Sequence, residues 1–155
     1  MLKIFQNTLV KTVSFQGLGL HSGKSSKITI LPGQIDQGIV FKRVDLKLNN
    51  IIPANFRNVS SAKLCTTLEN EYGVKVSTVE HLLAALYISE IDNAVIEINN
   101  EEVPIMDGSA KDFLDILSHV EIKRENKKRK FLKVKNKVEL IDGKRKISIE
   151  PIDSA

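Results

Sequence analysis

The chain has 155 residues, of which 42% are hydrophobic, and its formal net charge is +4. This length allows one ordinary domain core with part of a second. No apolar run reaches the roughly 18 residues of a membrane-spanning helix, and residues 1–12 lack the apolar region of a secretory signal, so we expect a cytoplasmic protein without a transmembrane segment. The single cysteine, Cys65, excludes a disulfide within the chain, and only three histidines are present to build a metal site.

Short segments with alternating apolar and polar residues predict strands over the first hundred residues. These segments are 11–15, 27–31, 39–43, 65–68, 74–76 and 94–98. Two further segments have apolar residues at the spacing of one helix face. These residues are Val79, Leu82, Leu83 and Leu86 in the first segment, and Phe113, Ile116, Leu117 and Val120 in the second. Because strands and helices do not alternate regularly, we predict an α+β fold, a two-layer sandwich of a mostly antiparallel sheet with two helices.

The glycine-rich segment 17–25 matches neither nucleotide-binding pattern. Leu18 stands where the P-loop requires glycine, and Ser22 stands where the dinucleotide-binding fingerprint requires it. The glycines instead predict a turn between strands, with His21 at its tip. His21 is then either a solvent-exposed residue or a group that lines a site.

Segment 77–81 places the carboxylate of Glu80 beside the imidazole of His81 at the start of the first predicted helix. Ser77 and Glu80 have the spacing of a capping box, in which each side chain hydrogen-bonds the backbone amide of the other residue. The helix dipole disfavours a protonated His81 and leaves a nitrogen lone pair free. Two interpretations stay open from these residues alone: a helix cap, and a metal ligand beside a general base.

Residues 103–110 lead into the second predicted helix, where Asp107 or Ser109 is expected to cap the helix N-terminus. His119 lies near the C-terminal end of that helix. The helix dipole explains an imidazole there better than metal binding does.

Most of the positive charge is concentrated in residues 123–130, which hold six basic residues and one acidic residue. Such a run is typical of a solvated linker and less often of a nucleic-acid or lipid-headgroup patch. No aromatic residue interleaves it to stack bases. We therefore predict a first α+β domain over residues 1–122 and a basic linker over 123–130.

After the linker, residues 131–141 and 144–151 alternate around Asp142-Gly143, a strong hairpin signal. A lone two-stranded ribbon is marginally stable in water, so the hairpin either folds back on the first domain or begins another domain. We expect the second option, in which residues 131–155 open a truncated second domain.

Five separated segments, in order along nearly the whole chain, carry a resemblance to a known family. They read G-L-G-L-H-S-G at 17–23, L-C-T at 64–66, S-T-V-E-H-L at 77–82 with A-A-L at 84–86, I-D-N at 91–93, and V-P-I-M-D-G-S at 103–109. Together they resemble the zinc-dependent UDP-3-O-acyl-N-acetylglucosamine deacetylases of bacterial lipid A (lipopolysaccharide) biosynthesis. The five together are far more specific than any one of them.

The resemblance implies that Glu80 is the general base and His81 a ligand of a catalytic Zn²⁺. Family members have two similar α+β domains and take two further zinc ligands from a His-x-x-x-Asp pair in the second domain. That spacing does not occur here. A catalytic zinc needs three protein ligands and a water, so we expect this chain alone to be inactive, with the missing C-terminal domain as its partner. We also expect the exposed interface to favour self-association.

The resemblance further implies that Leu64 and Cys65 line the substrate passage, that His21 is a weaker lining residue, and that Asp107 lies near the active site, although its capping role stays open. The competing hypothesis is a non-catalytic α+β module that binds RNA or a protein through residues 123–130, with Glu80 only capping its helix. We favour the enzyme, which has the UDP-sugar as its substrate and no nucleic-acid partner.

Overall fold

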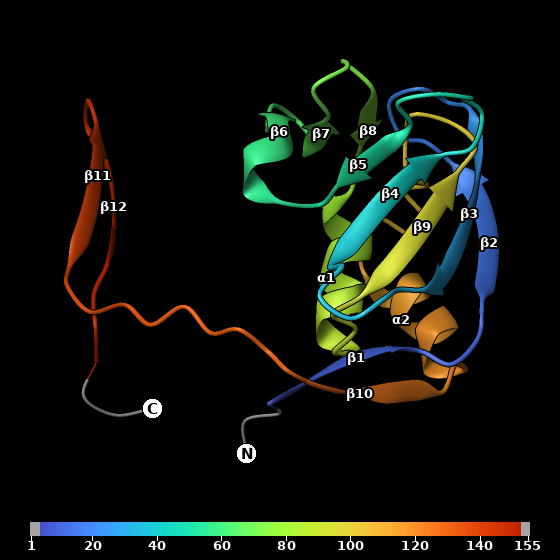
Figure 1. Cartoon of the computed structure of the whole chain (residues 1–155). Coiled ribbons are helices and arrows are strands. Elements are labelled where there is room, and N and C mark those ends of the chain that lie inside the picture. The colour runs from blue at the N-terminus through green and yellow to red at the C-terminus, as the bar shows by residue number, and fades with distance from the viewer. Residues whose placement is uncertain (1–3, 153–155) are drawn as a thin grey trace.

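The computed structural model describes residues 4–152 of the chain (Figure 1). It has two helices, several mostly antiparallel sheets and a C-terminal hairpin, so the predicted α+β class is confirmed. The expectation of a single sheet is only partly confirmed, because the strands described form four separate sheets.

The largest sheet has five strands in the order β2-β3-β9-β4-β5. Their bounds are Val13–Leu18, Ser25–Pro32, Ala94–Ile98, Ile39–Arg43 and Ile51–Pro53, respectively. β4 and β9 run parallel, while the other neighbours are antiparallel. The predicted segments 39–43 and 94–98 coincide with β4 and β9, and the others overlap their strands with shifted ends.

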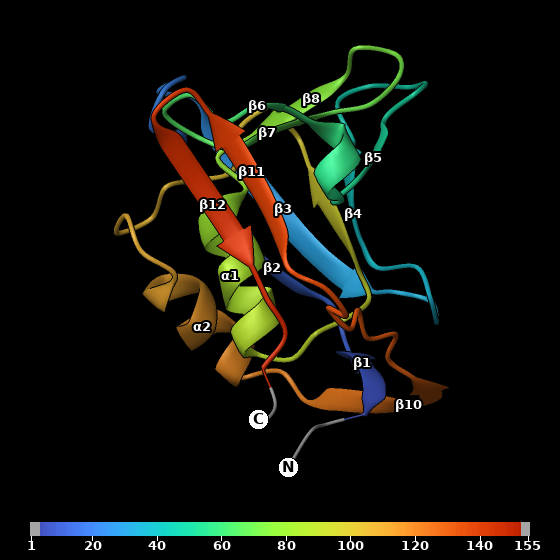
Figure 2. The same cartoon turned by 90° about the vertical axis from the view of Figure 1, so that its left-hand side faces the viewer.

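Helices α1 (Glu80–Ile88) and α2 (Lys111–Ser118) cover one face of this sheet (Figures 1 and 2). Their predicted apolar faces are largely confirmed, because Leu82 and Leu86 of α1 and Phe113 of α2 are buried in the core. The Phe113 ring meets Phe15 of β2 edge to face, with centroids 5.5 Å apart. Within residues 4–152, neither helix has the length and apolar character to cross a membrane.

A small three-stranded sheet, β6-β7-β8, directly precedes α1 in the chain. It consists of β6 (Val59–Ser61), preceded by the 3₁₀ turn η1 (Phe56–Asn58), β7 (Thr67–Glu69) and β8 (Lys75–Ser77). The buried Arg43 guanidinium joins this sheet to the large one, because it donates to the carbonyl of Lys75 at 2.8 Å. Asp45 holds the guanidinium in place through two further hydrogen bonds.

The basic segment is a strand over most of its length, so the expectation of a linker is wrong for residues 123–128. β10 (Ile122–Lys128) pairs antiparallel with β1 (Phe5–Leu9), a strand that the periodicity did not predict. Side chains of β10 stay largely exposed, but Arg124 stacks on the Phe5 ring at 3.9 Å. Backbone pairing and stacking therefore order a segment whose charge pattern is typical of linkers.

The I-D-N segment fastens this two-stranded ribbon to the rest of the fold. Asp92 accepts two hydrogen bonds of 2.8 Å from the Arg129 guanidinium and one of 2.7 Å from the backbone amide of Asn7. The buried Asn93 amide donates to the Gln6 side chain at 2.9 Å. β1 is thus held by polar contacts, which explains why a hydrophobic pattern did not reveal it.

The predicted C-terminal hairpin is confirmed as β11 (Val138–Asp142) and β12 (Arg145–Ile149). Its two-residue loop is Gly143-Lys144, one position later than expected, with Gly143 at φ 57°. In Figure 1 the hairpin stands apart from the sheets and helices. One of its faces carries four apolar side chains that are between 56% and 69% exposed, namely Val138, Leu140, Ile147 and Ile149.

Candidate functional site

Helix α1 begins at Glu80 after a sharp turn at Thr78, whose backbone has φ 57°. The expected capping box is absent from this turn. The Ser77 amide and hydroxyl both donate to the carbonyl of Glu101, at 2.8 and 3.2 Å, and Val79 at the N-cap position has no side-chain cap. Glu80 is therefore not occupied with capping its own helix.

The Glu80 carboxylate instead reaches the loop between β6 and β7. Its Oε2 accepts a hydrogen bond of 3.0 Å from the backbone amide of Thr66. Leu64 precedes it in the same loop with φ 69° and is 86% exposed, while Cys65 is half-buried. The structure thus brings Glu80 beside the segment that contains two of the predicted lining residues.

The His81 imidazole is half-buried next to Glu80, and it makes no hydrogen bond within residues 4–152. A half-buried imidazole with free nitrogens fits a metal such as zinc, which accepts histidine nitrogen. Over the same described residues, no group of three histidine, cysteine or acidic side chains is placed to hold a metal ion. Among the described residues, His81 is thus a candidate nitrogen ligand with a carboxylate beside it.

The His21 loop reaches the turn before α1 through a buried carboxylate. Glu102 is 1% exposed, and it accepts hydrogen bonds from the amides of His21 and Ser22, at 2.9 and 2.7 Å, and from the Thr78 hydroxyl at 3.1 Å. Burial by itself raises the pKa of the Glu102 carboxyl. The amides and the Ser22 and Thr78 hydroxyls outweigh burial and leave this pKa below its ordinary value.

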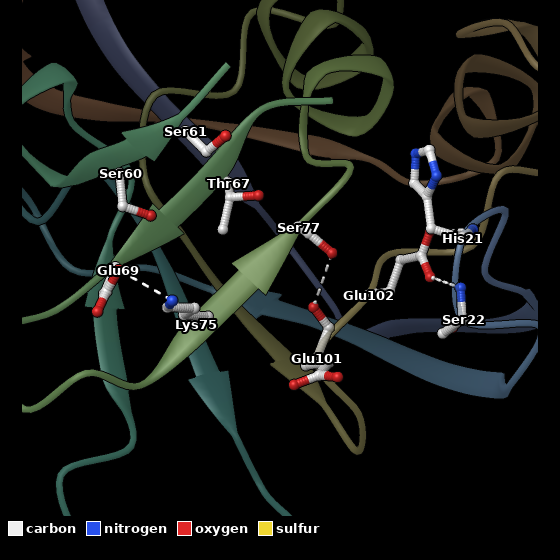
Figure 3. A pocket seen from close by; sticks show the side chains of 10 residues that line it. All are labelled: His21, Ser22, Ser60, Ser61, Thr67, Glu69, Lys75, Ser77, Glu101 and Glu102. Carbon is white, nitrogen blue, oxygen red and sulfur yellow. Dashed lines mark hydrogen bonds and ion pairs between the residues drawn. The ribbon is translucent and has the colours of Figure 1, made fainter. Parts of the chain in front are cut away.

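An open cleft of about 490 Å³ lies on this side of the molecule (Figure 3). It runs from the His21 loop across the face of the small sheet, and a Glu69–Lys75 ion pair crosses its far end. In Figure 3 the carboxylate of Glu102 lies against the backbone of His21 and Ser22, and the His21 ring points away from it. His21 lies in a turn, as predicted, and it is exposed at the rim of this cleft.

Asp107 lies in the turn that precedes α2. Within residues 4–152 its side chain makes no hydrogen bond to the other predicted site residues. Its Oδ1 accepts from the hydroxyl and the amide of Ser109, at 2.8 and 2.9 Å, and these two bonds lower the pKa of the carboxyl. Ser109 in turn accepts from the Lys111 amide at 3.0 Å. The N-cap position of α2 is Ala110, so neither expected residue occupies it. Ser109 nevertheless bonds the first amide of the helix, and Asp107 holds Ser109 in place.

His119 follows the end of α2, and its Nδ1 donates to the carbonyl of Asp115 at 2.7 Å. This hydrogen bond to the helix terminus agrees with the expected structural role.

Thr78 and Glu102 are the two residues that shape the site and that the sequence did not predict. A threonine at positive φ and one of two adjacent glutamates carry no periodic or motif signal, so only their burial and contacts reveal them.

Comparison with known proteins shows the family of this chain. Residues 6–155 match the family model of LpxC, UDP-3-O-acyl N-acetylglycosamine deacetylase. Similar curated proteins include the UDP-3-O-acyl-N-acetylglucosamine deacetylases of Shewanella baltica and Shewanella oneidensis, each 43% identical over 148 residues. The alignment covers 96% of this chain and 48% of either relative, so the chain spans about half the length of the curated relatives it matches. Because the family model matches almost the whole sequence, the chain belongs to the UDP-3-O-acyl N-acetylglycosamine deacetylase family.

Proposed function

We propose that this chain is part of a protein that removes the acetyl group from UDP-3-O-acyl-N-acetylglucosamine, an early step of lipid A biosynthesis in the cytoplasm. The observation that carries the proposal is the pair at the start of α1. Glu80 is held by the Thr66 amide rather than by its own helix, and the half-buried His81 beside it has no hydrogen bond within residues 4–152. The family match supports the same reaction class.

His81 is the zinc ligand in this proposal. A catalytic zinc takes three protein ligands and leaves one position open. Within residues 4–152 no group of three such donors is present. In this proposal the other two ligands come from the half of the relatives that this chain does not span. His81 fits the metal because its ring is partly shielded from water and its nitrogens are free.

Glu80 is the general base. One of its oxygens is fixed by the Thr66 amide at 3.0 Å, which leaves the other oxygen to accept a proton from the attacking water. Zinc bound at His81 would lower the pKa of a coordinated water to about 7 and polarise the acetyl carbonyl. The hydrogen bond to Thr66 also holds the carboxylate next to the loop of Leu64 and Cys65. This proximity supports the proposal that these two side chains line the substrate passage.

His21 is a further lining residue in this proposal, because it stands at the rim of the cleft that begins beside the turn of Thr78. Asp107 is the weakest of the proposed lining residues. Its carboxylate is committed to Ser109 in the structure, which supports a local structural role at least as well as a role near the substrate.

The hairpin β11–β12 opens the second domain in this proposal. Its four-residue apolar face is exposed, and an apolar strand face of this kind normally packs against another layer. The half of the relatives that this chain does not span would supply that layer. This 155-residue chain alone is then expected to be inactive and to self-associate through such exposed surfaces.

The alternative of an RNA-binding or protein-binding module finds little support in the contacts of the basic segment. Its cations largely face partners within the chain, which reduces the charge available to phosphates. These contacts are Lys123 with Glu125, Arg124 with Phe5, Lys127 and Lys130 with Asp36, and Arg129 with Asp92.

Zinc analysis tests the proposal most directly. The comparison uses this 155-residue chain and an extended protein, by which we mean these residues continued to the full length of the relatives. We expect about one zinc per molecule and deacetylation of UDP-3-O-acyl-N-acetylglucosamine only in the extended protein. An extended protein that folds without zinc, or that has zinc but no deacetylase activity, contradicts the proposal.

Two variants of the extended protein separate the proposed roles. Glu80→Gln keeps the size of the side chain but cannot take a proton, so we expect turnover to fall about 10²- to 10⁴-fold with zinc content unchanged. His81→Ala removes a ligand, so we expect zinc itself to be lost. If both variants had the zinc content and the activity of the wild-type extended protein, the assigned roles would be excluded.

A further inference from the structure

Glu102 is a buried acidic side chain that the proposed reaction does not use. It is 1% exposed, and its two oxygens accept three hydrogen bonds from two separate parts of the chain. Two donors are the backbone amides of His21 and Ser22, and the third is the hydroxyl of Thr78. A buried carboxylate without a cation is costly unless such donors are fixed around it, so this arrangement is specific.

The His21 loop is shaped to receive this carboxylate. A Cβ at Gly19 would collide with Oε2 of Glu102 and with the hydroxyl of Ser22. A Cβ at Gly17 would meet the Pro104 side chain at 2.9 Å, so the neighbouring glycine also permits close approach to the segment after Glu102. The G-x-G spacing that failed as a nucleotide motif is explained by this packing.

The other end of the contact lies at the turn that starts helix α1. The backbone around Glu102 pairs with Ser77, since the Ser77 amide donates to the carbonyl of Glu101 and the Val103 amide donates to the carbonyl of Ser77. The Glu102 side chain then holds Thr78, which has φ 57° and is 2% exposed. A β-branched residue at positive φ is strained and persists only where its surroundings fix it.

We propose that Glu102 is a positioning residue of the deacetylase site, which ties the His21 loop to the Thr78 turn and thereby fixes the direction in which Glu80 and His81 leave that turn. This inference rests on the proposed function. Glu102 touches neither the substrate nor the metal in this role. It acts through the hydroxyl of Thr78, two residues before Glu80, and through the backbone amides of His21 and Ser22.

A carboxylate is the side chain that this position requires. Both oxygens face hydrogen-bond donors, so a glutamine at position 102 would turn its NH₂ group toward the Ser22 amide or toward the His21 amide and the Thr78 hydroxyl. An aspartate is one methylene shorter and cannot keep both sets of contacts. The depressed pKa of Glu102 keeps the carboxylate ionised at neutral pH, as this geometry demands.

The test measures kcat per zinc-loaded molecule of the extended protein, so that loss of folded or metal-bound protein does not count as loss of catalysis. We expect Glu102→Gln to lower this kcat about 10- to 100-fold, because small misplacements of catalytic groups have effects of that size. Glu121→Gln is the control. Glu121 is an exposed glutamate that does not line the cleft, only its backbone carbonyl bonds Val10, and its kcat should equal that of the wild type.

Variants at Thr78 separate positioning from simple stabilisation of the fold. Thr78→Val replaces the hydroxyl by a methyl group and should lower kcat per zinc, whereas Thr78→Ser keeps the hydroxyl and should retain it. Adding Thr78→Val to Glu102→Gln should produce a smaller loss than the product of the two separate losses, because both changes act on the same cluster of hydrogen bonds. A merely structural Glu102 would lower folded fraction and zinc content together, with kcat per zinc unchanged.

The activity of the wild-type extended protein distinguishes failure of the positioning role from failure of the proposed function. If the wild-type extended protein is active and Glu102→Gln matches it per zinc-loaded molecule, the positioning role is overturned and the proposed function stands. If the wild-type extended protein has no deacetylase activity, the proposed function fails and this inference fails with it. In the 155-residue chain, Glu102→Gln should also shift the amide resonances of His21 and Ser22, and unchanged resonances would contradict the contact itself.

Discussion

The carboxylate of Glu80 accepts a hydrogen bond from the backbone amide of Thr66 at 3.0 Å, so the first residue of helix α1 is anchored to a loop fourteen positions earlier in the sequence. That loop holds Leu64 at φ 69° with its side chain 86% exposed. Positive φ in a non-glycine residue is uncommon and accumulates near functional sites. The hydrogen bond between Glu80 and Thr66 thus links the start of α1 to the loop that holds the strained Leu64.

Leu64→Gly should stabilise the chain or leave its stability unchanged. Glycine adopts positive φ without the steric cost of about 1 kcal/mol or more, and the exposed leucine loses little packing. Leu48 is the matched control, because it is 79% exposed and has no positive φ, so Leu48→Gly should lower stability. Urea unfolding of the two variants beside the wild type measures the difference, and an equal loss in both would show that Leu64 is not strained.

The ionisation of Glu102 should make part of the stability depend on pH. The pKa of Glu102 in the fold is below its ordinary value of 4.5, so its contribution is full above that value and is lost as the pH falls through the lowered folded pKa. Glu102→Gln should therefore destabilise the 155-residue chain most at pH 7 and progressively less below about pH 4. Unfolding midpoints across pH check this, and a constant difference between variant and wild type would contradict it.

Arg129 should not be replaceable by lysine. Its planar guanidinium makes two parallel hydrogen bonds to Asp92, which a single ammonium group cannot reproduce. We expect Arg129→Lys to cost about 1–2 kcal/mol in free energy of unfolding and to increase hydrogen exchange in β1 and β10. Lys127→Ala is the control, since its ion pair with Asp36 is long and exposed, and it should cost under about 0.5 kcal/mol.

Removing the hairpin should leave the first domain intact. Every residue of β11 and β12 is exposed, and no residue after Lys130 belongs to the hydrophobic core described. A chain ended after Lys130 should therefore keep the thermal midpoint of the full 155 residues. A chain ended after Glu121 also loses β10 and the Arg129–Asp92 contact, and it should melt well below the other two. A large fall caused by the first truncation would mean that the hairpin docks on the body of the fold.

Several features of this protein follow from local patterns in the sequence. Alternation predicted β4 and β9 with correct ends, and the spacing of Leu82, Leu86 and Phe113 predicted which helix faces enter the core. The hairpin was also predictable, since a glycine in a two-residue loop is a local requirement of the backbone. In each case the residues that decide the structure lie close together in sequence.

Other features depended on contacts between distant residues. β1 and β10 are held by backbone pairing and by Asp92, more than thirty positions from Arg129, so the charge pattern of residues 123–130 predicted a linker instead. The capping box was wrong for the same reason, because the Ser77 amide is taken by the Glu101 carbonyl.

The sequence by itself determined the fold class, the helix faces and the neighbouring Glu80 and His81, because hydrophobic periodicity and adjacency are properties of short segments. Only the tertiary structure decided what those two side chains face, and it brought Thr66 to Glu80 and Glu102 to Thr78 and the His21 loop. Hydrogen bonds between distant segments satisfy buried polar groups, and such partners are fixed only when the whole chain has packed.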